Sequence, residues 1–418
     1  MKTRLLIVGL LIALGLLGWS LLRRPYARTA EPIRVGILHS LTGTMAISEQ
    51  AVVDATLMAI AEINERGGLL SREVEPVVLD GRSDWPTFAR QAEALITEHR
   101  VGVIFGCWTS ASRKAVKPVL ERHDHLLFYP LQYEGLELSA NIVYTGASPN
   151  QQVIPAVKWC FDHLGNRFFL VGSDYVFPRT ANAIIKDQIA AFGGRVVGEE
   201  YVLLGSSDVT RVIERIVASR PDVLLNTING NSNVAFFHEL RAAGITPEKI
   251  PTMSFSIAEH ELRSLGAAQM VGDYACWNYF QSIDSPVNAK FVADFKQRYG
   301  PNQVTDDPME AAYFGVYLWA QAVKEAGSVA PGAVRRTIKS QSFNAPEGIV
   351  YIDAENQHTW KMVRIGQITK EGQFEIRWSS EKPVRPVPYP IFRPRWEWES
   401  FLNHLSSRWG GEWANPGG

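Results

Sequence analysis

Apolar and polar positions follow two alternating periods along most of this 418-residue chain. Short apolar runs typical of buried strands are followed by segments with an apolar residue every three or four positions, which is typical of helices. The first such pair is a strand within 33–43 and a helix over 48–66, which ends before Gly67-Gly68. Strand and helix keep alternating, so the pattern predicts parallel sheets and the α/β class.

Two series of these units follow one another and predict two similar lobes. The first series continues with strands at 74–80, 101–105 and 125–129, and with helices at 85–99 and from Ser110 onward. The second series begins after 148–150, with helices at 152–163, 180–191, 209–219 and 233–243, and with strands near 167–173, 196–204, 221–227 and 250–254.

The pattern changes near residue 272. Helices are predicted at 288–299, 307–327 and 328–340, and the alternating segments 348–368 and 372–384 predict an antiparallel appendage. We therefore expect a first lobe from 33–150 plus 277–345, a second lobe from 151–276 plus 346–382, and a Pro/Trp-rich extension over 383–418. Its tryptophans indicate packing across the outside of a lobe, with a membrane interface as the alternative.

Residues 5–22 form an apolar run without a charge, flanked by Lys2, Arg4 and Arg23-Arg24. The run is just long enough to span a bilayer as a helix and is long for a cleaved signal. Residues 1–30 are therefore predicted to be a signal or membrane anchor, which places the remaining chain outside the cytoplasm. No cysteine follows the run, so lipid attachment there is excluded.

Composition and charge narrow the function classes. A net charge of -1 and the lack of basic clusters disfavour nucleic acid as a partner. The cysteines Cys107, Cys160 and Cys276 are too far apart for a metal knuckle and predict buried free thiols.

No catalytic or cofactor motif is present. The sequence contains no G-x-S-x-G elbow, Walker loop or dinucleotide fingerprint, and no His-Glu pair has the second histidine of a zinc-protease helix. We therefore expect neither an enzyme nor a cofactor or metal. An amidohydrolase is the weakest alternative.

The stretch 101–135 organises the predicted site. Two parallel strands joined by a helix bring both strand ends to one edge of a sheet, where open α/β sheets bind ligands. The residues that should therefore meet at one crevice are Trp108, Thr109, Ser110, Tyr129, Gln132 and Tyr133. Further turns at predicted strand ends, near Gly43, Ser173 and 229–233 and over 254–259, offer hydroxyls and free N–H groups. Each alone could be a helix cap, but together they favour a binding cleft between two lobes.

Eight segments resemble a known family. They are GCWTSASRKAVKPV, LLFYPLQYEGLE, NIVYTGASPNQQ, FFLVGSDYVFPRTAN, LLNTINGNSNVAFFHELR, CWNYFQSIDSP, TDDPMEAAYFGVYLW and FNAPEGIVYIDAENQH. In this order they resemble the urea-binding proteins of bacterial urea ABC transporters and, more distantly, amide-binding amidase regulators and branched-chain amino-acid binding proteins. The resemblance covers about residues 33–390 and implies the type I periplasmic-binding fold, with two lobes joined by three crossovers that close on ligand.

The resemblance also implies a set of ligand contacts. The first lobe would contribute Trp108 and Ser110, followed by Tyr129, Leu131 and Gln132 from the second strand-end turn. The second lobe would contribute Tyr175, Phe177, Ser256 and Glu259. Asn229, in the amide-rich turn 229–233, is a further candidate because its side-chain oxygen could accept a ligand N–H. In the YPLQYEG segment, Leu131 and Gln132 favour urea over acetamide as the ligand.

Urea is a neutral molecule with one acceptor oxygen and four N–H donors. A matching pocket needs donors such as Ser110 or turn amides, and acceptors such as Gln132 or tyrosine hydroxyls. The implied partners are the subunits of an ABC permease. The alternative is a membrane-tethered sensor of short aliphatic amides that takes no part in transport.

Overall fold

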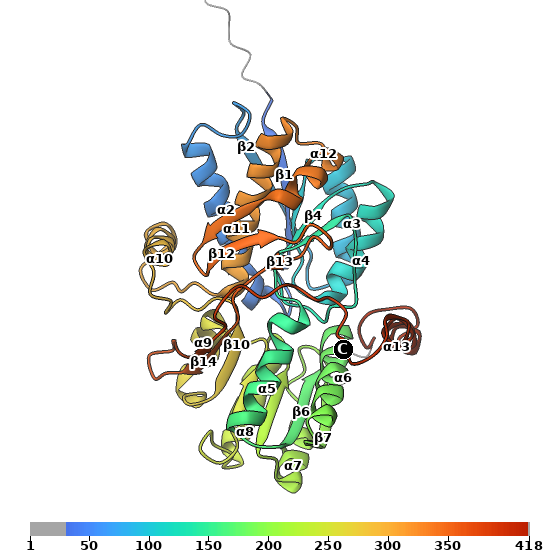
Figure 1. Ribbon diagram of the computed structural model, residues 1–418, viewed down its shortest axis with the longest axis vertical. Helices are drawn as coiled ribbons and strands as arrows, with labels where there is room; N and C mark the ends of the chain where they lie inside the picture. The colour runs from blue at the N-terminus through green and yellow to red at the C-terminus, as the bar shows by residue number, and fades with distance from the viewer. Residues whose placement is uncertain (1–30, 417–418) are drawn as a thin grey trace, which may run out of the picture.

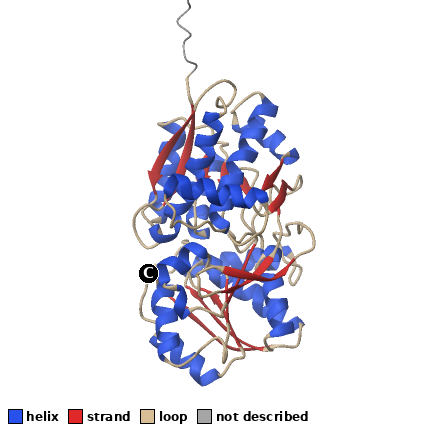
Figure 2. Cartoon of the chain, turned by 90° about the vertical axis from the view of Figure 1, so that its left-hand side faces the viewer, coloured by secondary structure: helices blue, strands red, loops and turns tan. Residues whose placement is uncertain are grey.

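The computed structural model describes residues 31–416 and arranges them in two lobes, which lie one above the other in Figure 1. Each lobe has its own sheet, and helices cover the sheets in both views (Figure 2). The predicted α/β class is therefore confirmed. The predicted leader, residues 1–30, lies outside the described residues.

The sheet of the first lobe is parallel throughout, with the strand order β2-β1-β3-β4-β5. Its strands are β1 (Ile33–His39), β2 (Val74–Asp80), β3 (Ile104–Gly106), β4 (Leu127–Tyr129) and β5 (Ile142–Tyr144). Its helices include α2 (Ala46–Glu65), α3 (Trp85–Thr97), α4 (Ser110–Arg122), α11 (Asp307–Ala326) and α12 (Pro331–Thr337). One buried apolar cluster joins β1, β3 and β4 to α2 and α11, which explains why these strands are almost wholly apolar.

The second lobe has the strand order β15-β14-β10-β9-β8-β6-β7. Its parallel strands are β6 (Arg167–Ser173), β7 (Arg195–Val202), β8 (Val223–Thr227), β9 (Thr252–Ser254) and β10 (Tyr274–Trp277). The antiparallel strands β14 (Arg364–Ile368) and β15 (Phe374–Ser379) extend one edge, as the alternating pattern predicts. Its helices are α5 (Val153–His163), α6 (Val176–Ala191), α7 (Thr210–Ser219), α8 (Ser232–Ala242) and α9 (Glu259–Leu265).

The chain passes between the lobes from β5 to α5, from β10 to α10 (Pro286–Tyr299), and from β13 (Thr359–Trp360) to β14. The small sheet of β11 (Ser342–Ala345), β12 (Gly348–Ile352) and β13 belongs to the first lobe, because Val350 and Ile352 are buried in that lobe's core. The boundary expected at residue 346 is therefore misplaced. Residues 346–360 pack against the first lobe.

Buried charges fix these crossovers. One carboxylate oxygen of Asp307 accepts the backbone N–H groups of Asn278 and Tyr279, both at 2.9 Å. Arg364 donates to the carbonyl oxygen of Asn278 and, at 2.9 Å, to that of Glu347. Because these contacts join α11, the β10 exit and β14, they hold two of the three crossovers together.

The C-terminal helix α13 (Arg395–Arg408) lies beside α6 in Figure 1. The apolar cluster that contains α6 also buries Trp398, Leu402, Leu405 and Trp409. The tryptophan-rich segment therefore packs against the outside of a lobe, which is the first of the two interpretations of its sequence. Cys107, Cys160 and Cys276 are buried and free, as predicted. Among residues 31–416, no helix is long and apolar enough to span a membrane.

Candidate functional site

The carboxyl ends of the strands from the two lobes point to the boundary between the lobes, which we call the crevice, and the lobes are in contact there. The Gln132 side-chain N–H donates to the carbonyl oxygen of Phe255 in the second lobe at 3.0 Å. A Cβ added at Gly230, which follows β8, would lie 3.1 Å from the Met45 sulfur of the first lobe. This close approach at two separate points shows that the lobes are closed on each other.

A tight turn directs the start of α4 into the crevice. Gly106 has a φ of +158°, and a Cβ there would lie 2.2 Å from the Leu38 carbonyl oxygen of β1, so only glycine fits. Thr109 then caps α4, with its hydroxyl accepting the Ser112 N–H at 3.0 Å. The Tyr129 hydroxyl donates to the Trp108 carbonyl oxygen at 2.6 Å. The predicted residues Trp108, Thr109 and Tyr129 are thus brought together, although Thr109 acts as a cap.

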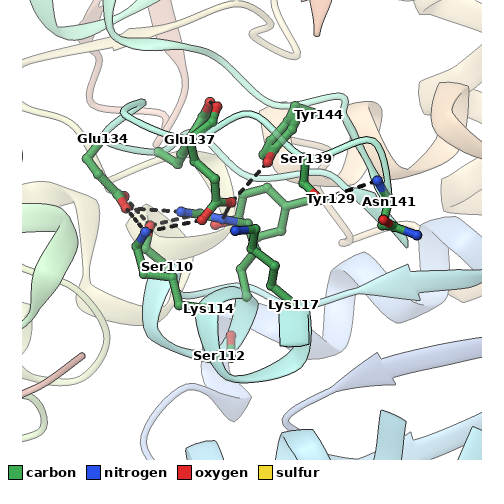
Figure 3. A network of polar contacts seen from close by, with 12 residues as sticks. Ser110, Ser112, Lys114, Lys117, Tyr129, Glu134, Glu137, Ser139, Asn141 and Tyr144 are labelled. Atoms are coloured by element: carbon green, nitrogen blue, oxygen red, sulfur yellow. Dashed lines mark hydrogen bonds and ion pairs between the residues drawn. The ribbon is translucent and has the colours of Figure 1, made fainter. Parts of the chain in front are cut away.

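Beside them lies a buried network of four charged side chains, of which Figure 3 labels Lys114, Glu134 and Glu137. Arg113 donates from Nε to Glu137 at 2.8 Å, from Nη2 to Glu134 at 3.0 Å and from Nη1 to the Ser110 hydroxyl at 3.0 Å. Lys114 donates to the other oxygen of Glu137 at 3.1 Å. The Arg113 and Glu134 side chains are fully buried. Two cations and two carboxylates thus neutralise each other inside the protein.

The network determines what Ser110 can offer a ligand. Its hydroxyl donates to Glu134 and accepts from Arg113. A hydroxyl has one donor hydrogen and two acceptor lone pairs, so only one lone pair remains for another partner. We expected Ser110 to be among the donors to a ligand oxygen, whereas in this arrangement it can serve only as an acceptor.

Gln132 and Leu131 complete the first-lobe side. Leu131 is buried in the same apolar cluster as Trp108 and Tyr129. The Gln132 amide nitrogen is bonded across the crevice, but its side-chain oxygen is buried and, within residues 31–416, has no hydrogen-bond partner. A buried unpaired acceptor costs free energy unless something donates to it, so this oxygen is a contact point for a ligand N–H.

From the second lobe, Tyr175 and Phe177 are both buried, with ring centroids 6.3 Å apart. Burial raises the pKa of Tyr175 well above its ordinary value, the nearby Tyr129 and Glu134 add to this, and the charge of Arg113 opposes it. The helix expected at 180–191 begins earlier than predicted. Helix α6 begins at Val176, so Phe177 lies in its first turn.

The remaining second-lobe residues are mostly occupied by local contacts. Asn229 donates from its backbone to Ser173 at 3.0 Å and from its amide to Thr227 at 3.1 Å. One oxygen of Glu259 accepts the Gln281 N–H at 2.6 Å. Burial raises the pKa of Glu259 well above its ordinary value, and the nearby acid Asp306 adds to this. Ser256 follows Phe255 and has a buried hydroxyl that lacks a partner among the described residues. Of these three residues, Ser256 is the one that follows Phe255, whose carbonyl oxygen accepts the hydrogen bond from Gln132 of the first lobe.

The charged network was not predicted, although the sequence holds a signal for it. Arg113 lies one helical turn after Ser110, on the same face of α4. Glu134 and Glu137 lie within the resembling segment LLFYPLQYEGLE. Charged residues inside otherwise apolar segments are usually paired when they are buried.

Two α/β lobes that close on a crevice lined by strand ends define a solute-binding protein with the type I periplasmic-binding fold. Residues 33–395 match the family described as "Periplasmic binding protein domain", and the chain belongs to this family. The expected fold is therefore confirmed, and the chain is a member of the periplasmic binding protein family. The ligand is not specified by this match.

The relatives include both a binding protein and a protein with an enzyme's name. Over 354 residues the chain is 23% identical to Leu/Ile/Val-binding protein homolog 6 of Brucella melitensis, a match covering 82% of this chain and 89% of that protein. A stretch of 124 residues is 36% identical to a Geobacillus stearothermophilus protein named limonene hydroxylase. That stretch covers 30% of this chain and 23% of the relative, so the name assigns no catalytic activity to this chain.

Solved structures show the same fold. The R. palustris ABC-transporter solute-binding protein in complex with 4-hydroxybenzoate has a TM-score of 0.76 and 22% identity, covering 84% of this chain and 98% of its own. A leucine-binding protein from Thermotoga maritima has a TM-score of 0.73 and 20% identity, covering 83% and 98%. Identities this low establish the fold alone.

Proposed function

We propose that this protein captures urea, or a short neutral amide, between its lobes and delivers it to an ABC permease. The observation that supports the proposal is that the Arg113 guanidinium is already paired within the protein. This residue is the cation that contacts Ser110, and all three of its guanidinium nitrogens donate to the protein's own Ser110, Glu134 and Glu137. A ligand carboxylate would have to displace these partners, whereas a neutral ligand would not.

The hydrogen-bonding groups fit a ligand rich in N–H donors. The free lone pair of Ser110 and the unpaired oxygen of Gln132 are acceptors on the first lobe. The N–H groups of Ser112 and Arg113 are used by Thr109, which leaves those of Ser110 and Ala111 at the start of α4 for the ligand's oxygen. Urea has four N–H donors and one oxygen and matches this set, and Trp108, Tyr129 and Tyr175 would enclose it.

Location and delivery follow from the same proposal. The apolar run 5–22 would export the protein or tether it to the membrane, with the two lobes outside the cytoplasm. Permease subunits are the proposed partners that receive the ligand when the lobes open.

Titration calorimetry with urea, acetamide, formamide, leucine and 4-hydroxybenzoate tests the ligand. We expect urea to bind in the micromolar to millimolar range, the short amides to bind more weakly, and leucine and 4-hydroxybenzoate to give no heat of binding. Saturable binding of 4-hydroxybenzoate or leucine, without binding of urea, would overturn the proposal.

Replacement of Ser110 by alanine should weaken urea binding by about tenfold, because one hydrogen bond to the ligand is lost at about 1–1.5 kcal/mol. Ser112→Ala is the matched control, since Ser112 lies on the same helix, is fully buried and bonds to Thr109 and not to the charged network. Calorimetry on both variants measures the difference, and cooperative thermal unfolding shows that each is folded. Equal affinities of Ser110→Ala and the wild type would show that the pocket lies elsewhere.

A further inference from the structure

The C-terminal extension, residues 383–416, contacts both lobes. It begins on the first lobe, where the Leu136 N–H donates to the Pro388 carbonyl oxygen at 2.8 Å and the Asn150 amide donates to the Arg385 carbonyl oxygen at 2.7 Å. It then crosses to the second lobe, where Arg393 donates to both carboxylate oxygens of Asp187 at 2.6 and 2.8 Å. Helix α13 follows, packed beside α6 (Figure 1).

After α13 the chain returns to the edge of the crevice. The Val176 N–H donates to the Trp413 carbonyl oxygen at 2.9 Å, and the Asn415 N–H donates to the Asp174 carbonyl oxygen at 3.0 Å. Tyr175 lies between these two contacts and is paired with Ala414 through an antiparallel bridge. The end of the chain is thus added as a short strand to the segment that carries Tyr175, a proposed ligand contact.

The same segment also contacts the first lobe. The Trp413 ring lies over the Lys114 ammonium, with 4.6 Å from Nζ to the ring centroid. On the other side, a cavity of about 340 Å³ is lined by both lobes and by the chain end. Its lining includes Thr44 and Trp85 from the first lobe, Leu204 from the second, and Ala414, Asn415 and Pro416 from the extension.

We propose that residues 412–416 act as a latch across the mouth of the crevice, and that Trp413 must leave Lys114 before the lobes can open. The latch is held to the second lobe by two backbone hydrogen bonds and one side-chain hydrogen bond, and it contacts Lys114 of the first lobe through a cation–π contact. When the lobes separate, the weaker contact breaks and the latch moves with the second lobe. A cation–π contact of this kind shifts an equilibrium by roughly 2- to 30-fold.

The latch shares one assumption with the proposed function, which is that ligand enters through the crevice between the lobes. Its test needs no ligand. Spin labels on cysteines introduced at Lys324 in the first lobe and Val217 in the second report the distance between the lobes by pulsed electron resonance. Both positions are exposed, and the native Cys107, Cys160 and Cys276 are buried, so labelling is selective.

We expect one narrow distance for the wild type and a second, longer distance for Trp413→Ala, with the open fraction raised several-fold. Trp413→Phe keeps an aromatic ring and should fall between the two. Trp396→Ala is the control, because Trp396 lies on the same extension but is 68% exposed. If Trp413→Ala and Trp413→Phe both give the wild-type distribution, the latch does not exist, whatever ligand the protein binds. If Trp413→Ala does not fold, Trp413→Phe decides.

Discussion

Replacement of Arg113 by methionine should lower the free energy of unfolding by about 3–5 kcal/mol, because it removes the cation that two buried carboxylates share. Glu134 and Glu137 both accept hydrogen bonds from Arg113 inside the protein. Burial alone would raise the pKa of Glu137, but the charges of Arg113 and Lys114 outweigh it and hold the pKa well below its ordinary value. Without Arg113, Lys114 is the only cation left in this network.

Guanidinium chloride unfolding measures this loss, and urea is unsuitable as the denaturant because it is the proposed ligand. Arg34→Met is the matched control. Arg34 pairs with Glu75 at 3.3 Å on the surface, where both side chains are about half exposed, and such pairs contribute roughly 0–1 kcal/mol. If Arg113→Met lowered the free energy of unfolding by less than about 1 kcal/mol, the buried network would contribute no more to stability than a surface ion pair.

The second large effect is a loss of stability in acid that depends on His358. Burial lowers the pKa of His358 to about 3. Its Nδ1 faces the Asn356 carbonyl oxygen at 2.8 Å, its Nε2 faces the Tyr133 hydroxyl, and its ring stacks on Tyr144 at 4.1 Å. Because the ring is buried and stacked against Tyr133 and Tyr144, the folded protein holds it neutral.

The sign of the pH dependence follows directly. In the unfolded chain the histidine binds a proton below about pH 6.5, whereas in the folded chain it does so only near pH 3. Stability is therefore lost as the pH falls from 6.5 towards 3, by on the order of 2–3 kcal/mol at pH 4.5. Asp273 and Glu347, both with a pKa raised to about 7 by burial, act in the opposite direction.

A comparison of variants isolates the contribution of His358. His358→Phe keeps the ring stacked on Tyr144 but cannot be protonated, so its stability should fall less between pH 7 and 4.5 than that of the wild type. His238→Phe is the control, because the His238 side chain is 64% exposed. Guanidinium chloride titrations at several pH values measure all three proteins. If the stability of His358→Phe and that of the wild type fell in parallel with pH, His358 would not be a cause of the loss of stability in acid.

The strands and helices of both lobes could be predicted because apolar periodicity is a local signal. Helix α2 was expected at 48–66 and is observed at Ala46–Glu65, and the glycines after it end it as predicted. The start of α6 could not be placed from the sequence. Tyr175 is held extended by Ala414, and the neighbouring Asp174 and Asn415 are 241 positions apart in the chain.

Within the crevice, the aromatic side chains could be predicted but the charges could not. Trp108, Tyr129 and Tyr175 come together because each belongs to a strand exit, and strand exits converge in this fold. The role of Ser110 depends on Glu134, which lies 24 positions later in the turn after β4. Because that turn brings both Glu134 and Glu137 to Arg113, three-dimensional packing was needed to show that the cation is already neutralised.

A crystal structure determined with urea tests the central claim most directly. We predict electron density for one urea molecule between the start of α4 and Tyr175, with a nitrogen within hydrogen-bonding distance of Ser110 Oγ and the oxygen facing the first N–H groups of α4. Lobes closed around an aromatic or amino-acid ligand that displaces Glu134 from Arg113, with no urea between them, would contradict the account.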